Sequence, residues 1–333
     1  MRLIKTEDAV GHVLCHDMTQ IIKDQYKDAR FRKGHVVTEE DIPVLLSMGK
    51  EHLYVWEMTS GMVHENDAAE RLLALCGQEN MIRSGVKEGK IELKAACDGV
   101  FLVDSARLVA VNSQDEVMIA TRKGGMAVRE GDKLAGMRVI PLIIEEEKLR
   151  KAEQAAGDKP LLSLKPYVRK TACIVATGGE VKKGLIKDTF TPVVIDKLKT
   201  YGIETLEVVY SGDGVENVRD AVLTMREKKP DMILCTGGMS VDPDDNTPGG
   251  IKAAGADIIA YGAPVLPGAM FLLGYFDDGM PVMGLPGCVM YAGATVFDLV
   301  LPKIAADVPV TRADLAALGE GGLCLGCKPC HYP

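Results

Sequence analysis

The sequence lacks two features that would assign it to large classes of protein. It has no apolar run near the roughly 20 residues that a membrane-spanning helix needs, and its first residues lack the apolar core of a signal peptide. We therefore expect no transmembrane helix and a cytoplasmic protein. It also lacks an excess of positive charge, because 39 Lys and Arg stand against 47 Asp and Glu, a net charge of -8. Too few cations remain to neutralise a phosphate backbone, which argues against nucleic acid as a partner.

A length of 333 residues is sufficient for two domains, each with its own core. Nine cysteines would indicate a disulfide framework in a small secreted chain, but this chain is neither small nor evidently secreted. Cys173 and Cys235 lie inside apolar runs and are expected to be buried strand residues. The cysteines near the C-terminus have a different pattern and are treated separately below.

The first half of the chain mixes helix and strand patterns. The capping-box pattern at residues 38–41 predicts a short helix, followed by a strand at 52–56. An amphipathic pattern predicts a helix over 65–76, with His64 and Glu65 as a cap and an exposed surface pair. Short β-rich runs separated by Gly and Asp turns then predict a small antiparallel sheet or barrel. These runs lie at residues 100–103, 108–111, 117–121 and 139–144.

A Glu-, Lys- and Ala-rich helix followed by Gly157-Asp158-Lys159-Pro160 indicates a domain boundary. We therefore predict a smaller β-rich α+β domain, a helical linker, an α/β domain and a cysteine-containing tail. Their expected ranges are 1–145, 146–168, 169–305 and 306–333.

The second half alternates strands with helices of about ten residues, which is typical of a mainly parallel sheet covered by helices on both faces. The fold class expected here is a three-layer α/β domain. Ligands of such sheets bind at the carboxyl ends of the strands. The strands are expected at 172–176, 204–210, 232–236, 257–260, 270–275 and 282–284, and the helices at 192–200, 215–227 and 289–301.

Three loops whose residues could bind a ligand follow predicted strands of this domain. The first is Thr177-Gly178-Gly179-Glu180, continued by the segment Gly184–Asp188, where glycines allow close approach and Glu180 and Asp188 supply carboxylates. The second runs from Thr236 to Asp245. The third is Gly284-Leu285-Pro286-Gly287, directly before a predicted helix whose N-terminus would bind an anion.

The second loop, residues 236–245, combines two kinds of ligand. Gly237 and Gly238 permit a positive φ, and Ser240 adds a hydroxyl. Three carboxylates follow that could hold Mg²⁺ bridged to phosphate oxygens. They belong to Asp242, Asp244 and Asp245.

Each loop alone also has an ordinary structural interpretation. A Gly-Gly pair after a strand is usually a turn, and an acidic cluster is more often a solvated turn or a helix cap than a metal site. Three such loops on one edge of one sheet favour a site for a phosphate-bearing ligand and a divalent metal. The reaction stays open at this level.

At these loops the sequence resembles the molybdenum-cofactor biosynthesis domain family over roughly residues 170–305. That family includes molybdopterin molybdenumtransferases, gephyrin-type proteins, molybdopterin adenylyltransferases and competence-damage-inducible proteins. The first loop resembles the transferase pattern Thr-Gly-Asp-Glu-Leu, with Gly179 in place of its Asp. The second resembles Gly-Gly-Val-Ser-x-Gly-x-x-Asp, with Asp242 in place of a glycine. The third matches Gly-Leu-Pro-Gly-Asn-Pro, except that Cys288 and Val289 replace its last two residues.

The resemblance implies a domain that binds molybdopterin at the strand ends. There molybdate is inserted into adenylylated molybdopterin, with Mg²⁺ and release of AMP. By this resemblance Glu180, Asp188 and Asp245 would be catalytic, and Asp242, Asp244 and Asp245 would bind metal. The ligand would be held by Thr177, Gly178, Thr236, Gly237, Gly238, Ser240, Pro286 and Gly287.

Two other functions remain open on the same residues. One is a carrier or sensor that binds the cofactor without turnover, which the substitutions at Gly179 and Cys288 favour. The other is a nucleotide pyrophosphatase of the competence-damage-inducible type, suggested by Gly237-Gly238 and Asp244-Asp245. The family also implies a dimer or trimer, and partners among molybdoenzymes or other cofactor-biosynthesis proteins.

The C-terminal segment carries Cys324, Cys327 and Cys330, with His331 next to the last cysteine. This tight spacing suits Zn²⁺ or an iron–sulfur cluster. The alternative is a disordered thiol-rich tail, because chain ends are often mobile. The two interpretations stay open on the sequence alone.

Overall fold

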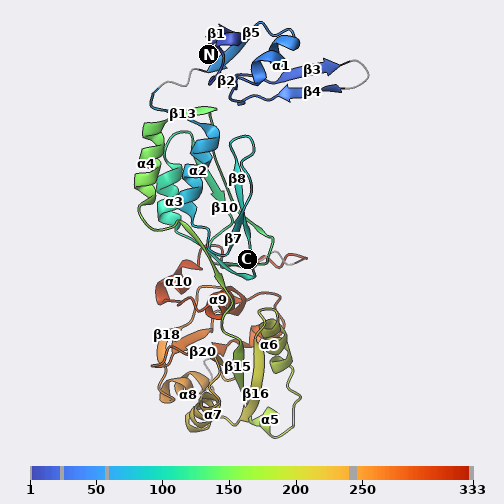
Figure 1. Cartoon of the computed structure of the whole chain (residues 1–333). Coiled ribbons are helices and arrows are strands. Elements are labelled where there is room, and N and C mark those ends of the chain that lie inside the picture. Colours follow the sequence, from blue (N-terminus) through green and yellow to red (C-terminus); the bar gives the residue numbers. More distant parts are fainter. Residues whose placement is uncertain (1, 23–25, 57–59, 240–245, 330–333) are drawn as a thin grey trace. The chain divides into compact units, whose positions relative to one another are not determined.

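The computed structural model describes residues 2–22, 26–56, 60–239 and 246–329. It divides the chain into two compact units (Figure 1). Unit 1 holds residues 1–97 and 101–164, and unit 2 holds residues 98–100 and 165–333. Each unit is described by itself below.

Unit 1 begins with a small β-rich region around a core that contains Leu14, Leu45, Leu53 and Val55, all fully buried. Its three-stranded sheet has the order β1-β5-β2 with antiparallel pairing, and β3 and β4 form a hairpin. Helix α1 starts at Asp41 itself, whose carboxylate accepts hydrogen bonds from the amide and hydroxyl of Thr38. The elements are β1 (Arg2–Lys5), η1 (Thr6–Asp8), β2 (Val13–Leu14), β3 (Met18–Ile22), β4 (Tyr26–Phe31), α1 (Asp41–Ser47) and β5 (His52–Trp56).

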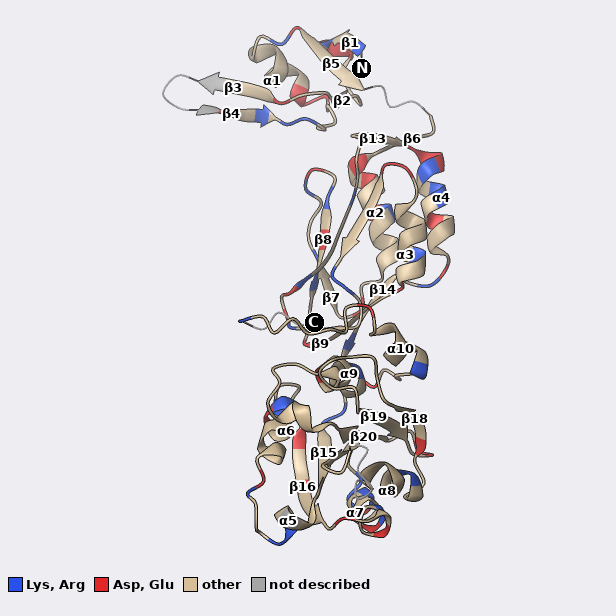
Figure 2. Ribbon diagram, turned by 180° about the vertical axis from the view of Figure 1, so that it is seen from behind, with Lys and Arg blue, Asp and Glu red and all other residues tan. Residues whose placement is uncertain are grey.

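The rest of unit 1 packs three helices against an antiparallel sheet of order β10-β12-β8-β7. The predicted antiparallel sheet is therefore present. Residues of both charges lie along α4 (Figure 2), and Arg71 of α2 forms an ion pair of 2.7 Å with Glu153 of α4. The elements are β6 (Met62–His64), α2 (Glu65–Cys76), β7 (Met81–Arg83), β8 (Ile91–Ala95), β9 (Gly99–Val103), α3 (Ser105–Asn112), β10 (Val117–Thr121), β11 (Met126–Val128), β12 (Lys133–Val139), β13 (Ile143–Glu145), α4 (Glu146–Ala156) and β14 (Leu162–Pro166).

Three expectations for unit 1 were wrong. The run at 139–144 is not one strand, because β12 ends at Val139 and β13 begins at Ile143. Residues 108–111 belong to helix α3 and not to a strand, because the Asp104 side chain caps the helix by accepting the amide of Arg107 at 3.1 Å. His64 does cap α2, since its ring accepts the amide of Asn66 at 3.2 Å. However, His64 and Glu65 are each only 5% exposed, so they are not a surface pair.

Unit 2 is a three-layer α/β domain built on a six-stranded sheet of order β16-β15-β17-β20-β19-β18. The first four strands are parallel, and β19 and β18 complete the sheet, with β19 antiparallel to both of its neighbours. Apolar residues of α6 and α9 cover one face, and those of α7 and α8 cover the other. The elements are β15 (Thr171–Thr177), α5 (Gly179–Lys182), α6 (Phe190–Lys199), β16 (Glu204–Ser211), α7 (Val215–Glu227), β17 (Met232–Thr236), α8 (Thr247–Ala253), β18 (Asp257–Tyr261), β19 (Leu272–Tyr275), β20 (Pro281–Leu285), η2 (Gly287–Met290), α9 (Val296–Ala305) and α10 (Arg312–Ala317).

The sheet is buried where it was expected to be. Cys173 of β15 and Cys235 of β17 are fully buried, as the apolar runs around them predicted. Burial raises the pKa of the Cys235 thiol to about 12, so this group stays a neutral thiol at physiological pH. Both cysteines are therefore packing residues of the central strands.

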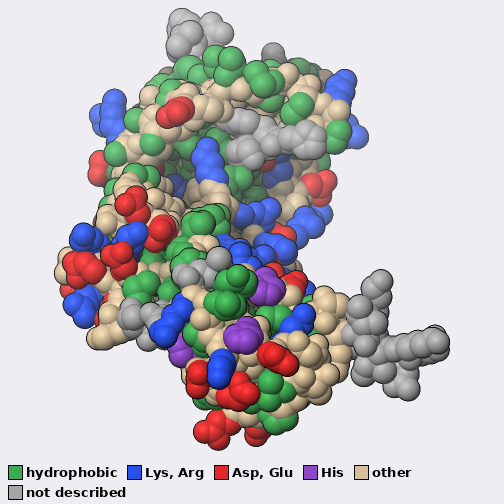
Figure 3. Space-filling view, turned by 90° about the horizontal axis from the view of Figure 1, so that it is seen from above, with side chains coloured by type: hydrophobic (Ala, Val, Ile, Leu, Met, Phe, Trp, Pro, Cys, Tyr) green, Lys and Arg blue, Asp and Glu red, His purple; other side chains and the backbone are tan. Residues whose placement is uncertain are grey.

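The surface mixes charge of both signs with scattered apolar side chains, as the face in Figure 3 shows. Within the part of the chain that the structure describes, no helix has the length and apolar character required to cross a membrane.

Candidate functional site

The carboxyl ends of β15, β17 and β20 lie side by side at one edge of the sheet. In the strand register Ala176 pairs with Thr236, and Thr236 pairs with Leu285. The loops that begin at Thr177, at Thr236 and after Leu285 therefore start next to one another, although they are far apart in sequence. Ligands of parallel sheets bind at this edge.

Two glycines of the second loop are required by close packing. Gly237 has a φ of +81°, and a Cβ placed on it would lie 2.4 Å from the carbonyl oxygen of Thr177. Gly238 has a φ of +57°, and its Cβ would lie 2.7 Å from the hydroxyl of Thr247. Any larger residue would push the second loop away from the first. The glycines thus bring two loop backbones together at the strand ends.

Two threonine hydroxyls connect these loops. The Thr177 hydroxyl lies 2.9 Å from the carbonyl of Thr236, and the Thr247 hydroxyl lies 2.9 Å from the carbonyl of Gly237. The two hydroxyls are also 3.1 Å apart. Each hydroxyl has a single proton, so the pair cannot make all three hydrogen bonds at once. A ligand oxyanion could therefore accept a hydrogen bond from one of these hydroxyls.

A carboxylate that the motif analysis missed lies beside the first loop. Asp213 follows β16, and its Oδ2 accepts the amide of Gly179 at 3.0 Å. A Cβ on Gly179 would lie 2.7 Å from the same oxygen. Asp213 thus places an acidic group beside Gly179. Its position after a strand at the same sheet edge was the available signal.

Asp188 serves as a cap for α6. Its Oδ1 accepts the amides of Phe190 at 2.9 Å and Thr191 at 3.0 Å, and its Oδ2 accepts the hydroxyl of Tyr210 at 3.3 Å. Burial by itself would raise the pKa of Asp188, but these hydrogen bonds hold the pKa of that carboxyl below its usual range. Asp188 is therefore ionised at neutral pH, with much of its hydrogen-bonding capacity already used.

The third loop differs from the prediction. Leu285 ends β20 and Pro286 follows it at the correct edge, but Gly287 opens the four-residue 3-10 helix η2 and not a long α-helix. The α-helix expected from residue 289 starts only at Val296, where Thr295 and Asp298 form a reciprocal capping box. Among the described residues, no α-helix begins at Gly287, so the expected anion site at a helix N-terminus is not present there.

Several predicted site residues lie outside the described residues. These are Ser240, Asp242, Asp244, Asp245 and Cys330. Glu180 lies in the short helix α5, and its side chain is likewise outside the description. Their proposed roles stay predictions.

The cysteine tail is attached to unit 2 by backbone pairing. The amide of Cys324 donates to the carbonyl of Leu266 at 2.8 Å, and the Cys324 sulfur accepts the amide of Gly326 at 3.5 Å. Cys327 is exposed. Among residues 2–22, 26–56, 60–239 and 246–329, no three His, Cys, Asp or Glu side chains are grouped closely enough to hold a metal ion. Two of the three predicted cysteine ligands lie within these ranges.

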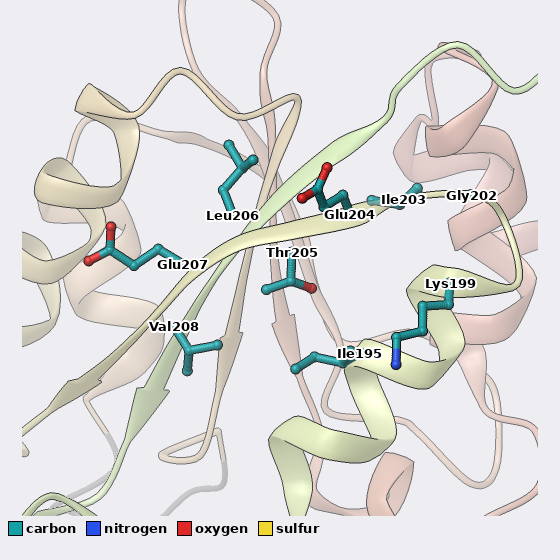
Figure 4. Close-up of a pocket in the computed structure, with 9 residues that line it drawn as sticks. All are labelled: Ile195, Lys199, Gly202, Ile203, Glu204, Thr205, Leu206, Glu207 and Val208. Carbon is teal, nitrogen blue, oxygen red and sulfur yellow. The ribbon is translucent and has the colours of Figure 1, made fainter.

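A hollow of about 600 Å³ lies elsewhere, beside the edge strand β16 (Figure 4). It is lined by Ile195 and Lys199 of α6 and by residues 202–208. These residues include the amino-terminal half of β16, the end opposite to Ser211. The hollow is thus separate from the loops at the carboxyl edge.

Comparison with known proteins matches two segments of the chain. Residues 173–306 match a family described as a probable molybdopterin binding domain, and residues 3–57 match a domain of unknown function. A CinA-like protein of Mycobacterium tuberculosis is 33% identical over 76 residues, which are 23% of this chain and 18% of that protein. A CinA-like protein of Petrotoga mobilis is 32% identical over 76 residues, 23% of this chain and 19% of its own length. The matched stretch spans less than a fifth of these curated relatives.

Two solved structures illustrate the structural matches. The molybdopterin biosynthesis enzyme MoaB from Thermus thermophilus is 17% identical, with 42% of this chain and 98% of that chain covered and a TM-score of 0.36. The molybdopterin biosynthesis MoeA protein from Pyrococcus horikosii is 16% identical, with 74% and 80% covered and a TM-score of 0.34.

Proposed function

We propose that this chain inserts molybdate into adenylylated molybdopterin, because residues 173–306 match a family described as a probable molybdopterin binding domain. The pterin phosphate would bind where β15, β17 and β20 end. The observation that carries the proposal is the pairing of Ala176 with Thr236 and of Thr236 with Leu285, which gives the three loops one common edge.

The described residues would act by binding and positioning. The backbone at Gly178, Gly237 and Gly238, with the hydroxyls of Thr177 and Thr247, would hold phosphate oxygens at close range. Pro286 and Gly287 of the third loop would contact the ligand from the end of β20. Fixed dipoles of this kind stabilise developing charge without reorganising during the reaction.

Acidic residues would stabilise charge and transfer protons during the reaction. Glu180, Asp188 and Asp245 are the proposed catalytic carboxylates, and Asp213 joins them through its contact with the Gly179 amide. Ser240 would add a phosphate contact. Mg²⁺, held by Asp242, Asp244 and Asp245, would supply neutralisation of phosphate and molybdate oxygens.

The test is AMP release. Purified protein is incubated with adenylylated molybdopterin, molybdate and Mg²⁺, and AMP is measured by chromatography. We expect release in the wild type and its loss in Asp245→Ala, with Asp257→Ala as a control on the far edge strand β18. Tight ligand binding without any AMP release would instead identify a carrier or sensor.

A second function is favoured by the CinA-like relatives. Their match to 23% of this chain supports a nucleotide pyrophosphatase of the competence-damage-inducible type as the alternative. The same preparation is then tested on ADP-ribose. Cleavage to AMP and ribose phosphate, without molybdate-dependent AMP release, would replace the transferase proposal by this one.

We also propose that Cys324, Cys327 and Cys330 bind Zn²⁺ or an iron–sulfur cluster. The amide of Gly326 donates to the Cys324 sulfur, and hydrogen bonds of this kind stabilise metal-bound thiolates. A cytoplasmic location, a dimer or trimer, and contacts with molybdoenzymes or other cofactor-biosynthesis proteins are further parts of the proposal.

A further inference from the structure

The second loop begins with a residue of the hydrophobic core. Met239 directly follows Gly237 and Gly238, and only 3% of it is exposed. Its side chain belongs to the cluster of buried residues between the sheet and helices α7 and α8. Loops normally run over the surface of a protein, so a buried side chain at this point fixes the loop to the core.

Gly284 of β20 makes room for that side chain. A Cβ on Gly284 would lie 2.6 Å from both the sulfur and the methyl carbon of Met239. Gly284 is not among the glycines with a positive φ. The space that it leaves, and not its backbone conformation, therefore explains the residue. The first glycine of the third motif thus serves the placement of the second loop.

Tyr261 holds the backbone of the same methionine. It is the last residue of β18, and its hydroxyl donates to the carbonyl of Met239 at 2.9 Å. Strand β18 is the outermost strand at its end of the sheet, and β19 and β20 lie between it and β17. Met239 is therefore fixed twice, through its side chain at β20 and through its carbonyl at β18.

The loop returns next to its own start. Thr247, the first residue of α8, donates its amide to the carbonyl of Gly238 at 3.2 Å. Its hydroxyl lies 2.9 Å from the carbonyl of Gly237, so Thr247 closes a short stem that runs from Gly237 to Met239. The predicted ligands among residues 240–245 lie in the sequence between these two fixed points of the backbone.

We propose that Met239 and Tyr261 are positioning residues, which hold this stem in its binding geometry before a ligand arrives. The proposal rests on the proposed function in placing a phosphate-bearing ligand at this edge of the sheet. Met239 and Tyr261 act through the backbone of the stem and not by touching the ligand. Backbone dipoles that are fixed in advance bind an anion without a further loss of chain entropy.

The test is amide hydrogen exchange of the full chain, measured by NMR without ligand. Tyr261 is 44% exposed, so Tyr261→Phe removes one hydroxyl and leaves the core intact. The amide of Thr247 should then exchange about fivefold faster, because one hydrogen bond that keeps the stem closed is lost. The amide of Gly262, which donates to the carbonyl of Phe271 at 2.8 Å, should keep its rate.

Tyr275→Phe is the matched control. The hydroxyl of Tyr275 accepts the amide of Val310 at 3.0 Å, and Tyr275 pairs with Pro281 at the amino end of β20, away from the loops. Both variants lose one hydroxyl hydrogen bond and should lower the urea midpoint to a similar extent. Only Tyr261→Phe should accelerate exchange at Thr247, which a merely structural role of Tyr261 would not do.

Calorimetric titration with AMP in the presence of Mg²⁺ gives the consequence for binding. Tyr261→Phe should bind AMP about fivefold more weakly than the wild type, and Tyr275→Phe should bind it equally well. Unchanged exchange at Thr247 in Tyr261→Phe, or equal acceleration in both variants, overturns the proposal. A wild type that releases no AMP, together with the expected exchange pattern, would refute the transferase and leave the positioning residues in place.

A double-mutant cycle tests the contact between Met239 and Gly284. Gly284→Ala should destabilise unit 2 strongly, because the new methyl group meets the Met239 side chain. In a Met239→Ala background the same change should cost clearly less, since that side chain is gone. Unfolding free energies from urea titration give the four corners of the cycle. Additive losses would show that Met239 is not held by this contact.

Discussion

The amide of Gly179 donates a 3.0 Å hydrogen bond to the carboxylate of Asp213. This contact joins the loop after β15 to the loop after β16, the neighbouring parallel strand. The carboxylate beside the first loop is thus supplied by a residue that follows the next strand. Loss of the acid at residue 179 therefore does not remove the negative charge from the strand ends.

Asp213→Asn tests whether that charge matters. We expect the variant to fold normally, because Asn can still accept the Gly179 amide, and to lower the rate of AMP release about tenfold or more because the charge is lost. Asp220→Asn on the exposed side of α7 is the control. An unchanged rate would show that Asp213 only shapes the loop, and would restrict its role to positioning.

Gly237→Ala should destabilise unit 2 and abolish ligand binding. The substitution combines a positive φ with a Cβ only 2.4 Å from the Thr177 carbonyl. Gly255→Ala is a matched control, since Gly255 has a φ of +93° but no atom within 4 Å of its Cβ. The control should lose about 1 kcal/mol of unfolding free energy for its backbone conformation, and Gly237→Ala at least about 2 kcal/mol more. Urea unfolding measures both, and equal losses would contradict the packing argument.

Asp231 should make the stability of unit 2 depend on acid. Burial would raise its pKa, but the amides of Lys170 and Thr171, at 2.6 and 2.8 Å, and the Thr171 hydroxyl hold the pKa of that carboxyl below its usual range. A carboxyl whose pKa is lower in the folded than in the unfolded state stabilises the fold at every pH above its unfolded-state pKa of about 3.9. That contribution is lost as the pH falls through the folded-state pKa.

Urea midpoints between about pH 7 and about pH 2.5 check this. Asp231→Asn should be less stable at neutral pH and should lose less stability than the wild type over the acid range. Asp257→Asn, a change in an exposed residue of β18, should follow the wild type. Parallel curves for Asp231→Asn and the wild type would show that the hydrogen bonds do not favour the ionised form.

The cysteine tail should carry metal. Elemental analysis of protein purified without chelator should give about one Zn²⁺ per chain, or iron with visible absorption if the group is an iron–sulfur cluster. Cys324→Ser and Cys327→Ser should each lower the content strongly, whereas Cys15→Ser in unit 1 should not. Wild-type protein without bound metal would favour a free thiol tail.

The sequence was sufficient for the long periodic elements and insufficient for the short ones. Helices α2 and α7 and strand β17 begin and end where the patterns predicted. Residues 108–111 were misread because a short apolar run fits strand and helix equally well, and the deciding cap at Asp104 was overlooked. The helix expected from residue 289 begins only at Val296. The interruption at residues 291–295 could not be recognised from the hydrophobic pattern.

The candidate site divides in the same way. Glycine motifs located the three loops, because parallel strands bring their carboxyl ends to one edge. Asp213 was missed as a site residue, since its contact with Gly179 joins segments distant in sequence. Glu65 was expected at the surface, because an acidic residue at a helix start is usually solvated, and its burial depends on packing against Gly34 and Gly89.

Strand β16 has a consequence for the behaviour of the protein in concentrated solution. It is the outermost strand at its end of the sheet, and it exposes Leu206 and Tyr210, which are 44% and 43% accessible. An open strand edge with apolar side chains is a template for joining other chains and precipitating. Glu204 and Glu207 both lie on this strand, and Glu207 forms an ion pair of 3.0 Å with Lys228. Charged side chains on an edge strand oppose edge-to-edge pairing of two copies, and Glu204 supplies such a charge on β16.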